Sequence, residues 1–263
     1  FGDGTMYIEH FVVNPRHIEF QILADSFGNV IHLGERDCSI QRNHQKMIEE
    51  SPSAAVSPEL REKMGHAAVT AAKAAGYVNA GTIEFLLEPD GKFWFMEMNT
   101  RIQVEHPVTE WVTGIDLVKE QLKIASGMPL EISQEDVRIQ GHAIECRINA
   151  ENPQKNFRPS PGTIQGAHFP GGNGIRVDTC VYNGCKIPPY YDSMLAKLIV
   201  HAGNRKEAIA KMQSALGEVI IDGIDTNIDY QYEILKDEDY QSGNFDTGFL
   251  ASHIIAGVKI NEN

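Results

Sequence analysis

Every second residue from Glu97 to Glu105 carries a functional group. Side chains alternate between the two faces of an extended strand. One face of this segment would therefore hold five such residues: Glu97, Asn99, Arg101, Gln103 and Glu105. The opposite face would be mostly apolar. A row of acids, amides and an arginine is unusual for a solvent-exposed strand, and the pattern predicts a site for a charged ligand.

A second carboxylate is expected close to Glu97. Residues 89–91 read Pro-Asp-Gly and predict a tight turn between two strands, which puts Glu84 about opposite Glu97. Two facing carboxylates repel each other, and a divalent cation with oxygen ligands compensates for that repulsion. Asn99 offers a further oxygen. The arrangement predicts Mg²⁺ held by carboxylates and by substrate phosphates, as in phosphoryl-transfer sites.

Two further groups of residues are weaker signals by themselves. Gln41, His44 and Lys46 lie in a polar run that predicts a loop, and His17 lies on a predicted strand. Lys46 could meet a phosphate as a point charge, but a solvated loop with a structural histidine explains these residues as well. No P-loop or dinucleotide-binding glycine motif is present in the sequence.

Arg147 ends a predicted strand, and Asp192 lies in a loop stiffened by two prolines. An arginine in such a place can stabilise a developing oxyanion, and an aspartate can orient it. A structural ion pair is an equally good explanation of these two residues at this point.

Periodicity and turn residues predict the elements that must position these side chains. Strands are expected at residues 7–13, 17–24, 30–33, 81–88 and 92–98, and much of 138–200 is strand-like. Helices are expected from an N-cap at Ser57 to Gly76, over residues 116–126, 204–217 and 227–235. Beyond residue 128 the sequence becomes mostly strand-like, with loops rich in Gly and Pro. This change predicts two domains, 1–128 and 129–263. The fold class is α+β with largely antiparallel sheets.

Composition restricts the possible functions. The chain has 263 residues and a net charge of −13, which opposes binding to nucleic acid. No apolar stretch approaches the roughly 20 residues of a membrane-spanning helix. The four scattered cysteines favour reduced thiols and a cytoplasmic location: Cys38, Cys146, Cys180 and Cys185. The chain begins at Phe1, which suggests a piece of a longer protein.

Several long motifs resemble those of biotin carboxylases, within the ATP-grasp superfamily. The run at residues 97–110, EMNTRIQVEHPVTE, is similar to the signature of that family, and the likeness extends to residues 35–46, 141–151, 159–162, 188–194 and 222–227. The resemblance implies the C-terminal half of an ATP-grasp fold followed by a biotin carboxylase C-terminal domain. The N-terminal and lid domains of the family are absent, so the resemblance implies that this chain alone is inactive.

The resemblance also implies a reaction: ATP, Mg²⁺ (or Mn²⁺) and bicarbonate carboxylate biotin held on a biotin carboxyl carrier protein. Its implied residues are the metal ligands Glu84, Glu97 and Asn99, the bicarbonate site Arg101, Gln103 and Val104, the general base Glu105, the enolate-stabilising Arg147 with Asp192 near it, the nucleotide-side His17, Gln41, His44 and Lys46, and Arg176 at a homodimer contact. Carboxyltransferase subunits are the further implied partners.

A physical constraint follows from these roles. Arg101 and Glu105 would lie roughly 13 Å apart along a straight strand, which is too far for both to act on one small anion. The chain is therefore expected to leave the strand after Arg101.

Three alternatives stay open. Another ATP-grasp carboxylate–amine or carbamoyl ligase would share the metal ligands, and the isolated chain could act as a dimerisation and carrier-docking module. The parent could be the biotin carboxylase subunit of acetyl-CoA carboxylase, which serves fatty acid biosynthesis, or a domain of another carboxylase such as pyruvate carboxylase. The polar tail at residues 259–263 favours a separate subunit.

Overall fold

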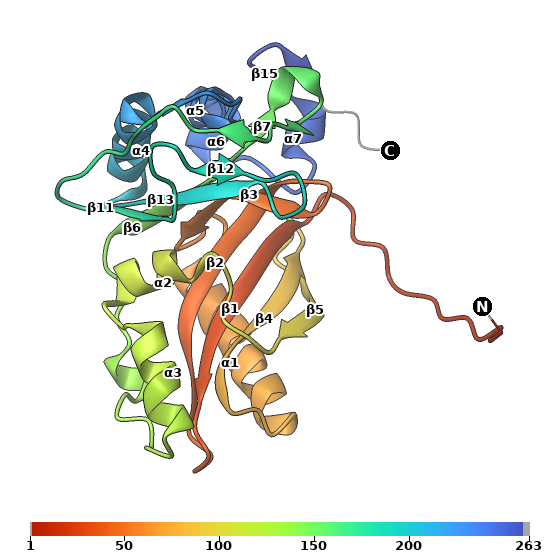
Figure 1. The fold of residues 1–263 in the computed structure, drawn as a ribbon. Coiled ribbons are helices and arrows are strands. Elements are labelled where there is room, and N and C mark those ends of the chain that lie inside the picture. The colour runs from red at the N-terminus through yellow and green to blue at the C-terminus, as the bar shows by residue number, and fades with distance from the viewer. Residues whose placement is uncertain (1, 260–263) are drawn as a thin grey trace.

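One antiparallel sheet runs through the chain, and it carries many of the residues singled out above, including His17, Lys46 and Arg147. The structure, a computed structural model, describes residues 2–259. Its main sheet has eight strands in the order β11-β13-β6-β3-β2-β1-β4-β5, and all neighbouring strands are antiparallel (Figure 1). These strands are β1 (Arg16–Ala24), β2 (Val30–Arg42), β3 (Gln45–Ser51), β4 (Asn79–Leu87), β5 (Phe93–Asn99), β6 (His142–Asn149), β11 (Ile175–Thr179) and β13 (Met194–Ala202).

Helices cover this sheet, and the second half of the chain adds several short strands. The helices are α1 (Pro58–Ala74), α2 (His106–Thr113), α3 (Leu117–Ala125), α4 (Arg205–Glu218), α5 (Ile228–Lys236), α6 (Glu238–Ser242) and α7 (Phe249–Ser252), with 3₁₀ turns at Gln134–Asp136 and Pro153–Lys155. The short strands are β7 (Glu151–Asn152), β8 (Arg158–Pro159), β9 (Gly162–Thr163), β10 (Gly166–His168), β12 (Lys186–Ile187), β14 (Ile220–Asp222), β15 (Ile254–Ile255) and β16 (Val258–Lys259).

The alternation of side chains along β1 divides the first half of the sheet into two faces. Ile18, Phe20 and Ile22 pack against α1, whereas Leu23 packs with α3 on the opposite side. Between these apolar residues, the same opposite face carries His17, Glu19 and Gln21 from β1. A polar row on an otherwise buried sheet needs partners, and those partners form the candidate site.

The pairing of β3 with β6 joins the two halves of the chain in one sheet, with Ile48 opposite Cys146. Beyond it, α4 and α5 pack on the second half around a core that includes Met212, Leu198 and Ile234. Figure 1 places α4, α5 and α6 together near β13 and β6, away from α1 and α3. The boundary expected near residue 128 falls after α3, and it stays a prediction.

Most of the expected elements are confirmed, including the α+β class with antiparallel sheets and the helices after Ser57, Asp116 and Asn204. Pro58 is the first residue of α1, and Ser57 accepts a hydrogen bond from the backbone N–H of Leu60. Among the described residues, no helix is long and apolar enough to cross a membrane.

Two predictions were wrong. Residues 7–13 form no strand and are mostly exposed. The run at residues 35–46 is not a solvated loop, because β2 continues to Arg42 and β3 begins at Gln45 after a two-residue turn in which Asn43 and His44 have φ values of 48° and 60°. The polar side chains of this run are buried because they bind side chains elsewhere in the chain, as Arg36 binds Glu19 and Asp37 binds Arg16. Of the polar tail expected at residues 259–263, residues 260–263 lie outside the described part, as does Phe1.

The cap of α1 gives a stability test. Replacing Ser57 by Ala removes the acceptor for the Leu60 N–H and should lower the free energy of unfolding by about 1 kcal/mol. Chemical denaturation followed by circular dichroism measures the change. Ser57→Asp, which keeps an acceptor, is the matched control, and an equal loss in both variants would contradict the capping role.

Candidate functional site

A single large cavity collects the predicted site residues. It has a volume of about 980 Å³ and is lined by every predicted site residue except Arg176: His17, Gln41, His44, Lys46, Glu84, Glu97, Asn99, Arg101, Gln103, Val104, Glu105, Arg147 and Asp192. These residues come from both halves of the chain, and the continuous sheet brings them together.

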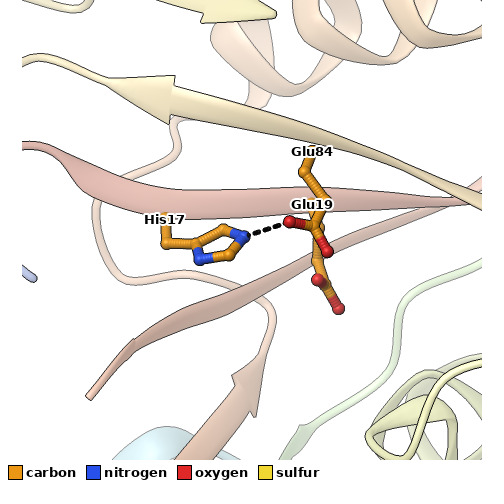
Figure 2. A group of neighbouring side chains, drawn as sticks. All are labelled: His17, Glu19 and Glu84. Carbon is orange, nitrogen blue, oxygen red and sulfur yellow. Dashed lines mark hydrogen bonds and ion pairs between the residues drawn. The ribbon is translucent and has the colours of Figure 1, made fainter. Parts of the chain in front are cut away.

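Strand register builds the centre of the cavity. Glu19 on β1 lies opposite Glu84 on β4, and Glu84 lies opposite Glu97 on β5, as the turn at residues 89–91 predicted. Figure 2 shows His17, Glu19 and Glu84 converging from β1 and β4, with His17 Nε2 at 2.8 Å from Glu84 Oε2. Glu19 and Glu84 are buried, and neighbouring buried carboxylates require positive charge.

Lys46 supplies much of that charge. Its ammonium group donates to Glu19 Oε2 at 2.5 Å, Glu84 Oε1 at 3.0 Å and Glu105 Oε1 at 2.6 Å. Burial opposes the charged form of Lys46, but the three acids outweigh it and raise the pKa of its ammonium above the usual range. Ligand atoms of His17, Glu19 and Glu84 lie within 4.8 Å of one another; Lys46 already provides the charge that a cation between Glu19 and Glu84 would bring.

Arg36 is the second cation of the network, and its role was not predicted from the sequence. It is fully buried, and its guanidinium donates to four side chains besides Glu19 at 2.5 Å. These are Gln21, Thr82, Gln103 and Thr109, at 2.7–3.2 Å. Burial opposes ionisation of Glu19, but Arg36 and Lys46 outweigh it and lower its pKa to about 2. An acidic residue inside the apolar alternation of residues 17–24 was the available signal for Glu19.

The predicted metal ligands lie together at the cavity edge. The Asn99 side-chain nitrogen lies 3.1 Å from Glu84 Oε1 and 2.9 Å from Glu97 Oε1, so the amide bridges the two carboxylates. The oxygen and nitrogen of an amide are assigned from such contacts, and turning the amide presents an oxygen instead. Two carboxylates and an amide oxygen suit Mg²⁺ or Mn²⁺, and these residues fit such a cation.

The segment after β5 departs from the strand, as expected from the distance between Arg101 and Glu105 in an extended chain. The strand ends at Asn99, and residues 100–105 are irregular up to α2. Gln103 donates to Glu84 Oε1 at 2.7 Å, and the Val104 carbonyl accepts from Lys197 Nζ at 2.9 Å. Arg101 is exposed at the mouth, where it contacts Asn99 Oδ1 at 3.2 Å.

Glu105 connects the two halves of the site. Its carboxylate accepts from Lys46 through Oε1 and from Arg147 Nη2 through Oε2, at 3.0 Å for the arginine. Arg147 also donates from Nε to Glu49 Oε1 at 2.5 Å. Glu49 was not singled out in the sequence. The base expected from the resemblance and the arginine expected on the biotin side are therefore in direct contact.

The remaining predicted residues lie farther out. His44, in the turn between β2 and β3, and Asp192 are both exposed at the cavity, and Asp192 Oδ1 accepts from the backbone N–H of Met194 at 2.8 Å. Arg176 lies outside the cavity and binds Glu110 at 2.6 Å and Asp178 at 2.8 Å.

Lys46 provides a test of the charge network. Replacing it by Met leaves three carboxylates without their shared ammonium, and the free energy of unfolding at neutral pH should fall by about 3–5 kcal/mol. The lowered pKa of Glu19, about 2 against 4.5 for a free side chain, means that its ion pairs stabilise the fold above pH 4.5. That stabilisation is lost as the pH falls toward 2.

The difference between Lys46→Met and the native chain should therefore shrink on acidification through that range. Urea unfolding across pH measures it. Lys92→Met, which removes an exposed ammonium bound to Asp90, is the control and should change little. A difference that is constant with pH would contradict the network.

Comparison with known proteins agrees with this geometry. Residues 1–133 match the family described as "Carbamoyl-phosphate synthase L chain, ATP binding domain", and residues 145–252 match "Biotin carboxylase C-terminal domain". Over 258 residues the chain is 58% identical to biotin carboxylase 1 of Bacillus subtilis, covering 98% of this chain and 57% of the relative. It is also 58% identical, over 250 residues, to a pyruvate carboxylase subunit of Methanothermobacter thermautotrophicus, covering 95% of this chain and 51% of the relative.

A solved structure gives the same result. The biotin carboxylase domain dimer of Hydrogenobacter thermophilus 2-oxoglutarate carboxylase, in complex with MgADP, ADP and bicarbonate, matches with a TM-score of 0.90 and 54% identity, covering 91% of this chain and 53% of that one. The chain spans about half the length of the relatives it matches. By its two matched regions, its fold and its sequence identity, the chain belongs to the biotin carboxylase family.

Proposed function

We propose that this chain forms the metal-, bicarbonate- and biotin-facing part of the active site of a biotin carboxylase, a ligase that carboxylates biotin on a carrier protein at the expense of ATP. The observation that carries the proposal is the contact of Glu105 with both Lys46 and Arg147 in one cavity. Phosphoryl-transfer groups and biotin-side groups have to meet at one place in such a reaction, and Glu105 lies where they meet.

Glu84, Glu97 and Asn99 are proposed to hold Mg²⁺ or Mn²⁺, which would neutralise charge on the ATP phosphates. His17, Gln41, His44 and Lys46 line the same cavity and match nucleotide-side positions of the family, so they are assigned to the nucleotide side. The relative from Hydrogenobacter thermophilus, which binds MgADP and bicarbonate, supports these ligands.

Bicarbonate is assigned to Arg101, Gln103 and the backbone at Val104, with Glu105 as the general base. Glu105 takes the proton of bicarbonate while a bicarbonate oxygen attacks the γ-phosphate and ADP leaves. The carboxyphosphate breaks down to carbon dioxide and phosphate, and the phosphate takes the N–H proton of biotin. Arg147 stabilises the enolate oxygen that forms, and the biotin nitrogen then adds to carbon dioxide. Asp192, at the rim, is assigned to the biotin side.

The partners follow from the same assignment. We propose a homodimer with Arg176 at its contact, a biotin carboxyl carrier protein as substrate and carboxyltransferase subunits as further partners. The dimeric relative supports the homodimer. We keep two proposals for the parent, acetyl-CoA carboxylase in fatty acid synthesis and another carboxylase such as pyruvate carboxylase; a relative named as a pyruvate carboxylase subunit supports the second. The chain by itself is proposed to be inactive, acting at most in dimerisation and carrier docking, and the cytoplasm stays its predicted location.

The test extends the chain with the N-terminal part that its longer relatives carry and measures ATP hydrolysis with bicarbonate, with and without free biotin. Hydrolysis should need bicarbonate and rise with biotin. Glu105→Gln should lower the biotin-dependent rate by about 10²–10⁴-fold, because the proton acceptor is lost.

Glu135→Gln, which changes an exposed glutamate outside the cavity, is the control and should behave as the native enzyme. Hydrolysis that ignores biotin, or that requires an amine, would contradict the biotin assignment and favour an ATP-grasp ligase of another kind.

A further inference from the structure

Two glutamates outside the cavity face each other behind Arg147. Glu49 on β3 and Glu145 on β6 are direct cross-strand partners, and both have 0% exposure. Opposite residues in such a pair have Cβ atoms about 4.5–5.5 Å apart. Glu145 shares its face of β6 with Arg147, and its partner on β13 is Ile199. Ile199 belongs to an apolar cluster with Val108 and Val112 of α2. The pair is therefore closed off from solvent.

Their hydrogen bonds are incomplete. Glu49 Oε1 accepts from Arg147 Nε at 2.5 Å, but Glu49 Oε2 and both oxygens of Glu145 are buried without a hydrogen-bond partner. Unpaired buried polar atoms are costly, and unpaired buried charge is more costly still. Three such atoms on two neighbouring carboxyl groups suggest a proton between them.

The charged groups around the pair cannot neutralise two carboxylates there. Arg147, Lys46 and Lys197 face it with Glu105, but each cation has other acids: Lys46 binds Glu19, Glu84 and Glu105, and Lys197 binds Asp178. From α2, His106 contacts the Gln103 carbonyl and Glu110 binds Arg176. Arg147 alone bonds to the pair, and it is shared with Glu105.

The pKa shifts of Glu49 and Glu145 agree with a proton retained by the pair. Burial raises the pKa of Glu49, and the nearby Arg147 only partly opposes this. Burial and the like charge of Glu49 raise the pKa of Glu145 well above the usual range. Two coupled acids of this kind lose their protons in steps that belong to the pair.

We propose that Glu49 and Glu145 form an acid pair that shares one proton at neutral pH and positions Arg147. One carboxyl O–H donates to the other carboxylate, which gives two of the three orphaned oxygens a partner and leaves a single negative charge to hold Arg147 Nε. Arg147 Nη2 then stays directed to Glu105 and the cavity. Loss of the shared proton would place a second negative charge beside the guanidinium and draw it away from the ligand. The assignment of a biotin-side role to Arg147 rests on the proposed function.

Infrared difference spectroscopy of the extended chain tests the shared proton without any reference to activity. A protonated-carboxyl C=O band that shifts in D₂O should be present at neutral pH. It should be lost in Glu145→Gln, where Glu49 is left to ionise with Arg147.

Glu50→Gln is the matched control. Glu50 is equally buried on the same strand, but Arg205 and His142 bind it, and its pKa is lowered because these hydrogen bonds and charges outweigh burial. Its removal should keep the band. Absence of the band in the native chain, or its persistence in Glu145→Gln, would overturn the proposal whatever the enzyme does.

Kinetics test the positioning role. Glu49→Gln should lower the biotin-dependent rate by about tenfold, since a hydrogen bond between charged groups is lost, while ATP hydrolysis without biotin is kept. Glu145→Gln imitates the protonated acid and should keep both rates at neutral pH. In the native enzyme, loss of the shared proton at alkaline pH should lower the biotin-dependent rate, and Glu145→Gln should remove that fall.

An equal loss of both rates in Glu49→Gln, or a Glu145→Gln variant as impaired as Glu49→Gln, would overturn the positioning role. If the native enzyme shows no biotin dependence, the proposed function fails, and the infrared result still stands by itself.

Discussion

The site depends on the ion pairs between the Lys46 ammonium group and three carboxylates. The carboxylates come from β1, β4 and the segment before α2. Each of these acids also binds a second residue: Glu19 binds Arg36, Glu84 binds His17, and Glu105 binds Arg147. Without a central cation, the acids would repel one another and the strands that carry them. The charge network therefore determines how closely the functional side chains approach.

Arg36 extends this network into the protein interior. A fully buried guanidinium is stable only where its donors are satisfied, and here five side chains satisfy them. Two of those side chains, Gln103 and Thr109, belong to the irregular segment and to α2. Arg36, which does not line the cavity, thus links the proposed bicarbonate site to the sheet. Rigid support of this kind lets a loop carry functional groups.

Strand pairing between β3 and β6 makes the two matched regions of the chain into one structure. Glu105 belongs to the first matched region and Arg147, on β6, belongs to the second, yet they touch. The acid pair of Glu49 and Glu145 lies at that same junction. A boundary drawn in sequence near residue 128 would divide this site, because its two halves are complementary sides of a single cavity.

The sequence by itself determined the local features: the caps of α1 and α4, the turn that sets Glu84 opposite Glu97, and the need for a bend before Glu105. Each depends on residues close in the chain, where turn chemistry and alternation act directly. Its long motifs also identified the family. The sequence did not predict that residues 35–46 are buried strand, nor the roles of Glu19, Arg36 and Glu49. Polar residues read as exposed unless their partners are known, and those partners lie far away in the chain, so only the tertiary structure decided which charges are buried together.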